Sequence, residues 1–71
     1  MNNHPGQVPT PCSERGRLIE KSGCFALRRE DGTEMWLELE TIPHHLVNSL
    51  VTVSGRRFPA QLIEVDAIGP G

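Results

Sequence analysis

The sequence predicts a mainly β protein: a small five-stranded barrel with one short helix between its third and fourth strands. Two observations support this prediction. Short runs of alternating apolar and polar residues recur between glycine-containing turns, and a period of two is typical of strands that bury one face. One run with helical spacing interrupts them after the third strand. The chain has 71 residues, so it forms one domain at most.

Residues 24–40 predict a β-hairpin, and their turn sets its register. A three-residue loop at 30–32 places Gly32 in the left-handed position of a G1 bulge. The expected cross-strand pairs are Phe25–Leu37 and Leu27–Met35 on the core face and Arg28–Glu34 on the outer face. A two-residue turn would slip this register by one residue and would mix core positions with solvent positions.

The first strand is predicted over residues 15–20, and it leads into the central hairpin. The loop at 21–23 again has two residues followed by glycine, so we expect a turn of the same kind. That register places Ile19 opposite Phe25 in the core. The outer face would then carry a cross-strand row of apolar side chains: Leu18, Ala26 and Trp36.

Residues 41–50 predict the short helix. Thr41 is a candidate N-cap, and Pro43 suits the first helical turn. Apolar residues recur with the spacing of one helix face at Ile42, Leu46, Val47 and Leu50. We expect this helix to close one end of the barrel.

The last two strands are predicted over residues 51–54 and 61–68. Their inward side chains are expected to be Val51, Val53, Ile63, Val65 and Ala67. The loop at 55–60 holds two cations and an aromatic ring: Arg56, Arg57 and Phe58. A three-strand meander, a helix and a final hairpin is the topology of the OB-fold. A small SH3-like barrel, which usually lacks a true helix at that junction, is the alternative.

Residues 1–13 predict a flexible tail, because they are rich in proline and hold almost nothing to bury. The barrel domain is therefore expected to span residues 14–71. Residues 1–14 lack the apolar segment of a secretory signal. No apolar run approaches the roughly 20 residues that span a bilayer. We expect a cytoplasmic protein that has no membrane partner.

Residues 16–70 contain the pattern G-R-L-I-E-K-S-G-C-F-A-L-R-R-E-D-G-x-x-x-W-L-E-L, followed by V-T-V-S-G and by L-I-E-V-D-A-I-G-P. In this pattern the chain resembles a family of short bacterial domains of unknown function. It resembles more loosely other small bacterial OB-like barrels that close on a V-x-V-x-G strand. The shared positions are mostly glycines and core residues, so the resemblance implies a barrel. It brings no catalytic residues with it.

Residue spacing argues against a metal site and against catalysis. Cys12, Cys24, His44 and His45 are of the types that zinc prefers, yet they show neither C-x-x-C nor H-x₃₋₅-H spacing. No spacing pairs a nucleophile with a base, and a barrel of this size is filled by its own side chains. We therefore expect a protein that is not an enzyme, binds no cofactor or metal, and keeps both cysteines as reduced thiols.

The expected function is binding through the outer face of the first three strands. An aromatic ring in an apolar row, rimmed by charges of both signs, is typical of a protein interface. We therefore expect an unidentified protein partner or a homo-oligomer. The candidate binding residues are Trp36, Leu18, Ala26, Arg28, Arg56, Arg57 and Phe58.

The alternative partner is single-stranded nucleic acid. OB-folds bind single strands across their second and third strands with the help of the adjacent loops, and aromatic and cationic side chains supply the contacts. Against this alternative, Glu34, Glu38 and Glu40 surround Trp36, and the net charge of the chain is −2. Carboxylates at the site repel phosphates, so we expect a protein partner first.

Overall fold

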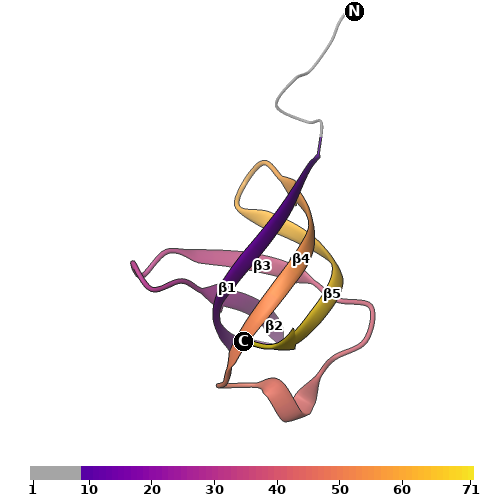
Figure 1. The fold of residues 1–71 in the computed structure, drawn as a ribbon. Helices are drawn as coiled ribbons and strands as arrows, with labels where there is room; N and C mark the ends of the chain where they lie inside the picture. Colours follow the sequence, from indigo (N-terminus) through magenta and orange to yellow (C-terminus); the bar gives the residue numbers. More distant parts are fainter. Residues whose placement is uncertain (1–8) are drawn as a thin grey trace, which may run out of the picture.

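The computed structural model describes residues 9–71, which form one sheet of five strands that closes into a ring (Figure 1). The elements are β1 (Thr10–Lys21), β2 (Cys24–Arg28), β3 (Glu34–Glu38), the 3₁₀ turn η2 (His44–Leu46), β4 (Leu50–Phe58) and β5 (Leu62–Pro70). The strand order around the ring is β1-β2-β3-β5-β4. Strands β3 and β5 pair in parallel, and the other neighbours are antiparallel. The predicted mainly β architecture with five strands is therefore confirmed.

The β2–β3 hairpin has the predicted register. Phe25 pairs with Leu37, Leu27 with Met35, and Arg28 with Glu34. The loop is closed by the Arg29 N–H, which donates to the Thr33 carbonyl at 2.8 Å, and by the Gly32 N–H, which donates to the Arg29 carbonyl at 2.9 Å. Gly32 has a φ of 90°, the left-handed conformation that glycine adopts without steric cost.

The β1–β2 hairpin differs from the prediction by one residue. Its turn has two residues, Ser22 and Gly23, with φ values of 54° and 85°. Two successive positive φ values are typical of the type I′ turn, whose twist matches that of the flanking strands. The pairs Lys21–Cys24, Ile19–Ala26 and Leu18–Leu27 result. The predicted outward position of Leu18 and inward position of Ile19 are therefore wrong, and Leu18 is fully buried in the core.

Strand β1 begins earlier than predicted. It pairs with β4 from Thr10 opposite Arg57 onward, so residues 10–13, which were predicted as part of the tail, belong to the sheet. Cys12 is half-buried and packs against the core. The ladder with β4 supplies backbone hydrogen bonds to this segment, although its own side chains are mostly polar. The remainder of the predicted tail, residues 1–8, lies outside the described residues.

A single 3₁₀ turn occupies the place of the predicted helix, so the helix over residues 41–50 is wrong. The chain leaves η2 at Val47 in an extended conformation, with φ −63° and ψ 134°. The Asn48 N–H then donates to the Leu18 carbonyl at 2.7 Å, and the Leu18 N–H donates to the Ser49 carbonyl at 3.0 Å. These bonds to β1 replace the bonds that would have continued a helix.

The side chains around η2 show the same difference from the predicted helix. Leu46 is buried and closes one end of the core, and Val47 packs beside it. Ile42 and Leu50, which belong to the same predicted stripe, are exposed. One turn of helix cannot bring four positions onto one face.

Strand β4 continues through residues 55–58 of the predicted loop at 55–60, so the placement of Arg56, Arg57 and Phe58 in a loop is wrong. The pairing shifts between Ser54 and Gly55, which face Ala67 and Val65 respectively and leave Asp66 as an extra residue. This β-bulge moves the alternation by one position. Ala67, predicted inward, is exposed, and Ile68 packs against the core in its place.

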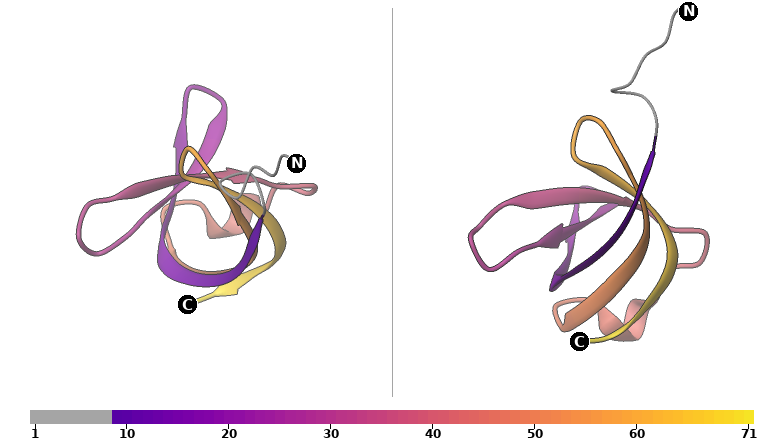
Figure 2. Two further views of the ribbon diagram at one scale, coloured as in Figure 1. Left: turned by 90° about the horizontal axis from the view of Figure 1, so that it is seen from above. Right: turned by 45° about the horizontal axis from the view of Figure 1, so that its top comes forward.

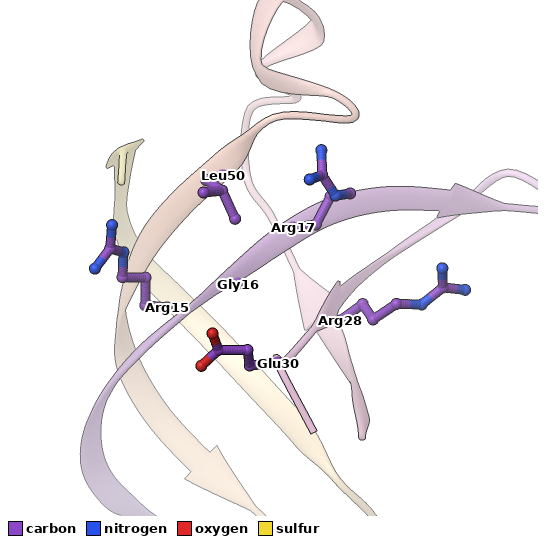
Figure 3. A pocket seen from close by; sticks show the side chains of 6 residues that line it. All are labelled: Arg15, Gly16, Arg17, Arg28, Glu30 and Leu50. Atoms are coloured by element: carbon purple, nitrogen blue, oxygen red, sulfur yellow. The ribbon is translucent and has the colours of Figure 1, made fainter. Parts of the chain in front are cut away.

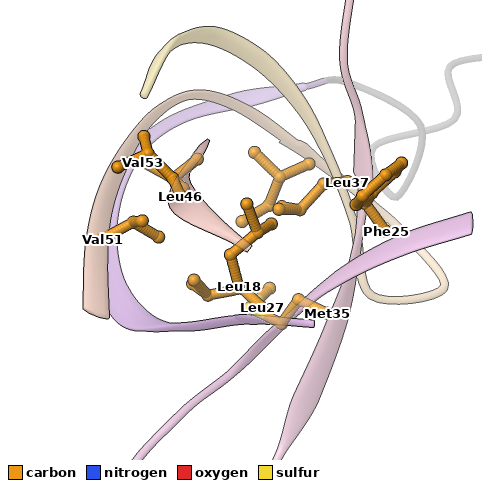
Figure 4. Packing of buried hydrophobic residues seen from close by; sticks show 9 residues of the cluster. Leu18, Phe25, Leu27, Met35, Leu37, Leu46, Val51 and Val53 are labelled. Atoms are coloured by element: carbon orange, nitrogen blue, oxygen red, sulfur yellow. The ribbon is translucent and has the colours of Figure 1, made fainter. Parts of the chain in front are cut away.

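The core fills the interior of the ring (Figure 4). All five strands and η2 contribute to it: Leu18, Phe25, Leu27, Met35, Leu37, Leu46, Val51, Val53 and Ile63. Among residues 9–71 no polar or charged residue is fully buried. The interior is therefore occupied by apolar side chains. Figure 2 shows that the turns of the β1–β2 and β2–β3 hairpins project outward from this ring.

Candidate functional site

A continuous line of apolar side chains crosses the outer wall of the sheet. Cross-strand pairing joins Ile19 to Ala26, Ala26 to Trp36, Trp36 to Leu62, and Leu62 to Phe58. Residues directly opposite each other share one face of a sheet. Their sequence neighbours on the other face, such as Leu18, Leu27, Leu37 and Ile63, belong to the core. We call this line the outer apolar row; its members are Ile19, Ala26, Trp36, Leu62 and Phe58.

Trp36 is the most exposed member of the outer apolar row, with 43% of its surface accessible. Ile19 and Ala26 are buried on the outer wall beside it, and Leu62 and Phe58 are half-buried. The backbone N–H of Trp36 donates to the backbone carbonyl of Gln61 at 2.7 Å, and this hydrogen bond joins β3 to the β4–β5 turn. Trp36 is therefore a large apolar side chain held on a hydrogen-bonded backbone, with apolar neighbours on both sides.

Glu34 pairs with two cations beside the row. Its Oε1 lies 2.6 Å from the Lys21 Nζ, and its Oε2 lies 2.8 Å from the Arg28 Nη2. The Lys21 ammonium also lies 5.9 Å from the centroid of the Trp36 ring, within cation–π range. The hydrogen bonds from Lys21, and next those from Arg28, lower the pKa of Glu34 below its ordinary value. Lys21 and Arg28 are thus both paired with one carboxylate.

The other flank of the row carries carboxylates on β3 and β5. Glu64 forms an ion pair with Arg56 of β4. Glu38 lies directly opposite Glu64 in the parallel β3–β5 pair. The row therefore has polar groups along both of its sides, as the rim of an interface does.

Six of the seven predicted binding residues are at the surface or in the row, and one is not. Trp36, Ala26 and Phe58 belong to the outer apolar row, and Arg28 and Arg56 flank it as members of ion pairs. Arg57 is exposed on β4 but lies opposite Ile63, a core position, and so falls outside the row. Leu18 is in the core, which removes it from the candidate surface.

Two members of the row, Ile19 and Leu62, were not predicted. Ile19 would have been found by reading Ser22-Gly23 as a two-residue turn, since that turn chemistry fixes the register of β1. Leu62 joins the row through parallel pairing with Trp36, at a sequence separation that no local pattern reveals.

Two shallow hollows of about 440 Å³ each flank this region, and they carry opposite charge. The basic hollow is lined by Arg15, Gly16, Arg17, Arg28, Glu30 and Leu50. The acidic hollow is lined by Glu38, Leu39, Glu40, Glu64, Val65 and Asp66. Figure 3 shows that the three guanidinium groups of the basic hollow spread around its rim and do not meet at one point.

The cysteine and histidine side chains that were considered as zinc ligands do not form a metal site in the part of the chain that the structure describes. Within residues 9–71 no three side chains of His, Cys, Asp or Glu lie close enough to hold a metal ion. Cys24 is exposed at the start of β2, whereas burial, and next the charge of Glu14, raises the pKa of the half-buried Cys12 thiol. In the part of the chain that the structure describes, no helix has the length and apolar character needed to cross a membrane.

Comparison of the sequence with known protein families identifies one family. A family model described as "Protein of unknown function (DUF5818)" matches residues 15–71. No curated protein and no solved structure matches the chain. The matched segment contains β2 to β5 complete and the second half of β1, which together carry the whole outer apolar row. The chain belongs to the DUF5818 family of proteins of unknown function.

Proposed function

We propose that this protein is a binding module with an OB-fold-like barrel, and that it associates with another protein through the outer apolar row. The fold assignment is supported by the strand order β1-β2-β3-β5-β4 and by the parallel β3–β5 pair. A β-meander followed by a turn of helix and a closing hairpin is the arrangement of that fold. The turn η2 occupies the place of the helix.

The row itself is the observation that supports association with a protein. Protein interfaces have an apolar centre with aromatic anchors, surrounded by a polar rim. Trp36 and Phe58 are aromatic members of one row, and Leu62 lies between them. Tryptophan is one of the residue types that are enriched among those that contribute most of the binding energy of an interface. The row thus supplies the centre of an interface, and the flanking ion pairs supply its rim.

The charges beside the row favour a protein over a nucleic acid. Two cations beside the row, Lys21 and Arg28, are both bound to Glu34. Arg56 is bound to Glu64. A phosphate backbone would have to break these pairs and approach the carboxylates, whereas a protein surface can extend such pairs with its own charged groups.

Affinity capture with matched variants tests this function. The wild-type protein, Trp36→Ala and Ile42→Ala are each used as bait in extracts of the native cell, with and without nuclease. Ile42 is a suitable control because it is an exposed apolar residue outside the row. We expect a discrete protein that survives nuclease, is retained by Ile42→Ala and is lost with Trp36→Ala. Capture that does not depend on Trp36 would contradict the proposal.

Single-stranded nucleic acid is the second candidate, and one observation favours it. Trp36 and Phe58 lie in one row with a cation over the Trp36 ring, and aromatic stacking combined with cations is how such proteins bind single strands. On this alternative, short single-stranded oligonucleotides bind the wild-type protein and are displaced as salt rises, because bound phosphates release counterions. We expect no such binding.

We also propose that the protein acts by binding alone, without catalysis, cofactor or metal. The core is apolar, and both hollows are shallow surface features lined by exposed charges. Purified protein to which no metal was added should contain no stoichiometric metal ion. Stoichiometric zinc in such a preparation would contradict this part of the proposal.

A further inference from the structure

We infer that the partner of the outer apolar row is a second copy of this chain, related by a two-fold axis that passes near Ala26 and Trp36. This inference rests on the proposed function and names its partner. It is supported by the placement of two like-charge pairs on the outer wall, one basic and one acidic, on opposite sides of the row.

The basic pair lies on β1 and β2. Arg17 is directly opposite Arg28, two residues from the row members Ile19 and Ala26. Like charges directly opposite each other destabilise a sheet. Arg28 is compensated by Glu34, whereas Arg17 makes a 2.6 Å hydrogen bond from its Nη1 to the Asn48 carbonyl. Among residues 9–71 no carboxylate forms an ion pair with Arg17.

The acidic pair lies on β3 and β5. Glu38 is directly opposite Glu64, two residues from the row members Trp36 and Leu62. Glu64 is compensated by Arg56. Within the described part of the chain no cation forms an ion pair with Glu38. Each flank thus holds one like-charge pair in which one member is neutralised and the other is not.

The two pairs lie on opposite sides of the row. Strands β1 and β3 run in the same direction, because each is antiparallel to β2. Arg17 precedes the row on β1, whereas Glu38 follows it on β3. A two-fold axis that lies in the plane of the contact, near Ala26 and Trp36 and across the line that joins the two pairs, would bring the basic pair of one copy onto the acidic pair of the other, twice. This self-complementarity is what an isologous dimer requires.

The two hollows extend the same complementarity. Arg17 and Arg28 line the basic hollow, and Glu38 and Glu64 line the acidic hollow. The spread of the guanidinium groups around the basic hollow suits several carboxylates on a second surface better than a single small anion (Figure 3). A core as small as this one also supplies little net stability, and oligomerisation is a common remedy in small domains.

A charge-reversal experiment tests the two-fold arrangement. Arg17→Glu places a carboxylate where each copy is expected to meet Glu38 of the other, and Glu38→Arg places a guanidinium where each copy is expected to meet Arg17 of the other. Each variant alone should be monomeric in sedimentation equilibrium, under conditions in which the wild type is a dimer. An equimolar mixture should form a heterodimer, because every contact between the two variants is again between opposite charges. Arg57→Glu and Glu20→Arg, which produce the same net charges outside the row, should stay dimeric.

The result separates this inference from the proposed function. Wild-type protein that stays monomeric at about 1 mM has no specific self-association, and the second-copy inference is then overturned. The proposed function would still stand if captured protein depended on Trp36. Dimers that persist in Arg17→Glu alone, or a mixture that does not re-form a dimer, would also overturn the inference. Trp36→Ala is expected to weaken the dimer at least about tenfold.

Discussion

Ala26 and Trp36 lie directly opposite each other on β2 and β3, yet Ala26 is 1% exposed and Trp36 is 43% exposed. Ala26 sits between Ile19 and Trp36 in the outer apolar row, so its larger neighbours shield it. This pair shows how the outer wall is built. Ile19 and Ala26 are buried within it, whereas the Trp36 ring projects into solvent.

The first prediction contrasts the outer wall with the core. Leu27→Ala removes a fully buried side chain and should lower the free energy of unfolding by about 2–5 kcal/mol. Trp36→Ala should lower it by less, because almost half of the ring is already in water. Urea denaturation followed by circular dichroism measures both changes. A greater loss of stability for Trp36→Ala than for Leu27→Ala would assign Trp36 to the core.

The second prediction concerns the close approach of β4 and β5 at the bulge. A Cβ atom on Gly55 would overlap with the Glu64 carbonyl oxygen, which is backbone and cannot move aside cheaply. Gly55→Ala should therefore destabilise the protein by about 1–3 kcal/mol. Gly69→Ala on β5 is the control, since a Cβ there meets nothing within 4 Å. Equal thermal midpoints for the two variants would show that the strands do not approach at Gly55.

The third prediction concerns the β1–β2 turn. Ser22 has a φ of 54°, and asparagine adopts this left-handed conformation more readily than serine does. Ser22→Asn should raise the free energy of unfolding by about 0.5–1 kcal/mol. Ser22→Val should lower it, because a β-branched side chain disfavours positive φ. If Ser22→Asn were no more stable than Ser22→Val in chemical denaturation, the two-residue turn and its register would be incorrect.

The fourth prediction follows from the lowered pKa of Glu34, which is caused by hydrogen bonds first from Lys21 and then from Arg28. A carboxyl group whose pKa is lower in the folded state stabilises that state above its unfolded pKa. That stabilisation is lost as pH falls below the ordinary value of 4.5 toward the lowered folded value. Wild-type protein should therefore lose more stability between pH 6 and pH 3 than Glu34→Gln does. Parallel losses in thermal melts would show that these hydrogen bonds do not form in solution.

The sequence predicted the β2–β3 hairpin correctly because two independent signals agree there. The alternation on both arms and the glycine at the third loop position admit one register only. At the β1–β2 hairpin the signals conflict, since Leu18 and Ile19 are both apolar and either can face inward. The turn then decides, and its two positive φ values favour the shorter loop.

The other differences between the sequence-based prediction and the structure arise from pairing between segments that are distant in the sequence. Residues 55–58 carry two arginines and have no alternation of their own, yet pairing with β5 and β1 makes them a strand. The helical spacing over residues 41–50 is overridden by hydrogen bonds between Asn48 and Leu18. For the same reason the sequence placed Trp36, Ala26 and Phe58 on the candidate surface but did not reveal Leu62, which reaches Trp36 only in the closed ring.

The emission of Trp36, the only tryptophan in the chain, tests most directly whether the outer apolar row is a protein-binding surface. Emission spectra would be compared for dilute protein, concentrated protein, and dilute protein with a short single-stranded oligonucleotide. We expect a blue shift on concentration, because the exposed ring loses water in the contact, and no change with the oligonucleotide. Emission that is unchanged on concentration, but is quenched by the oligonucleotide and restored by salt, would contradict the account.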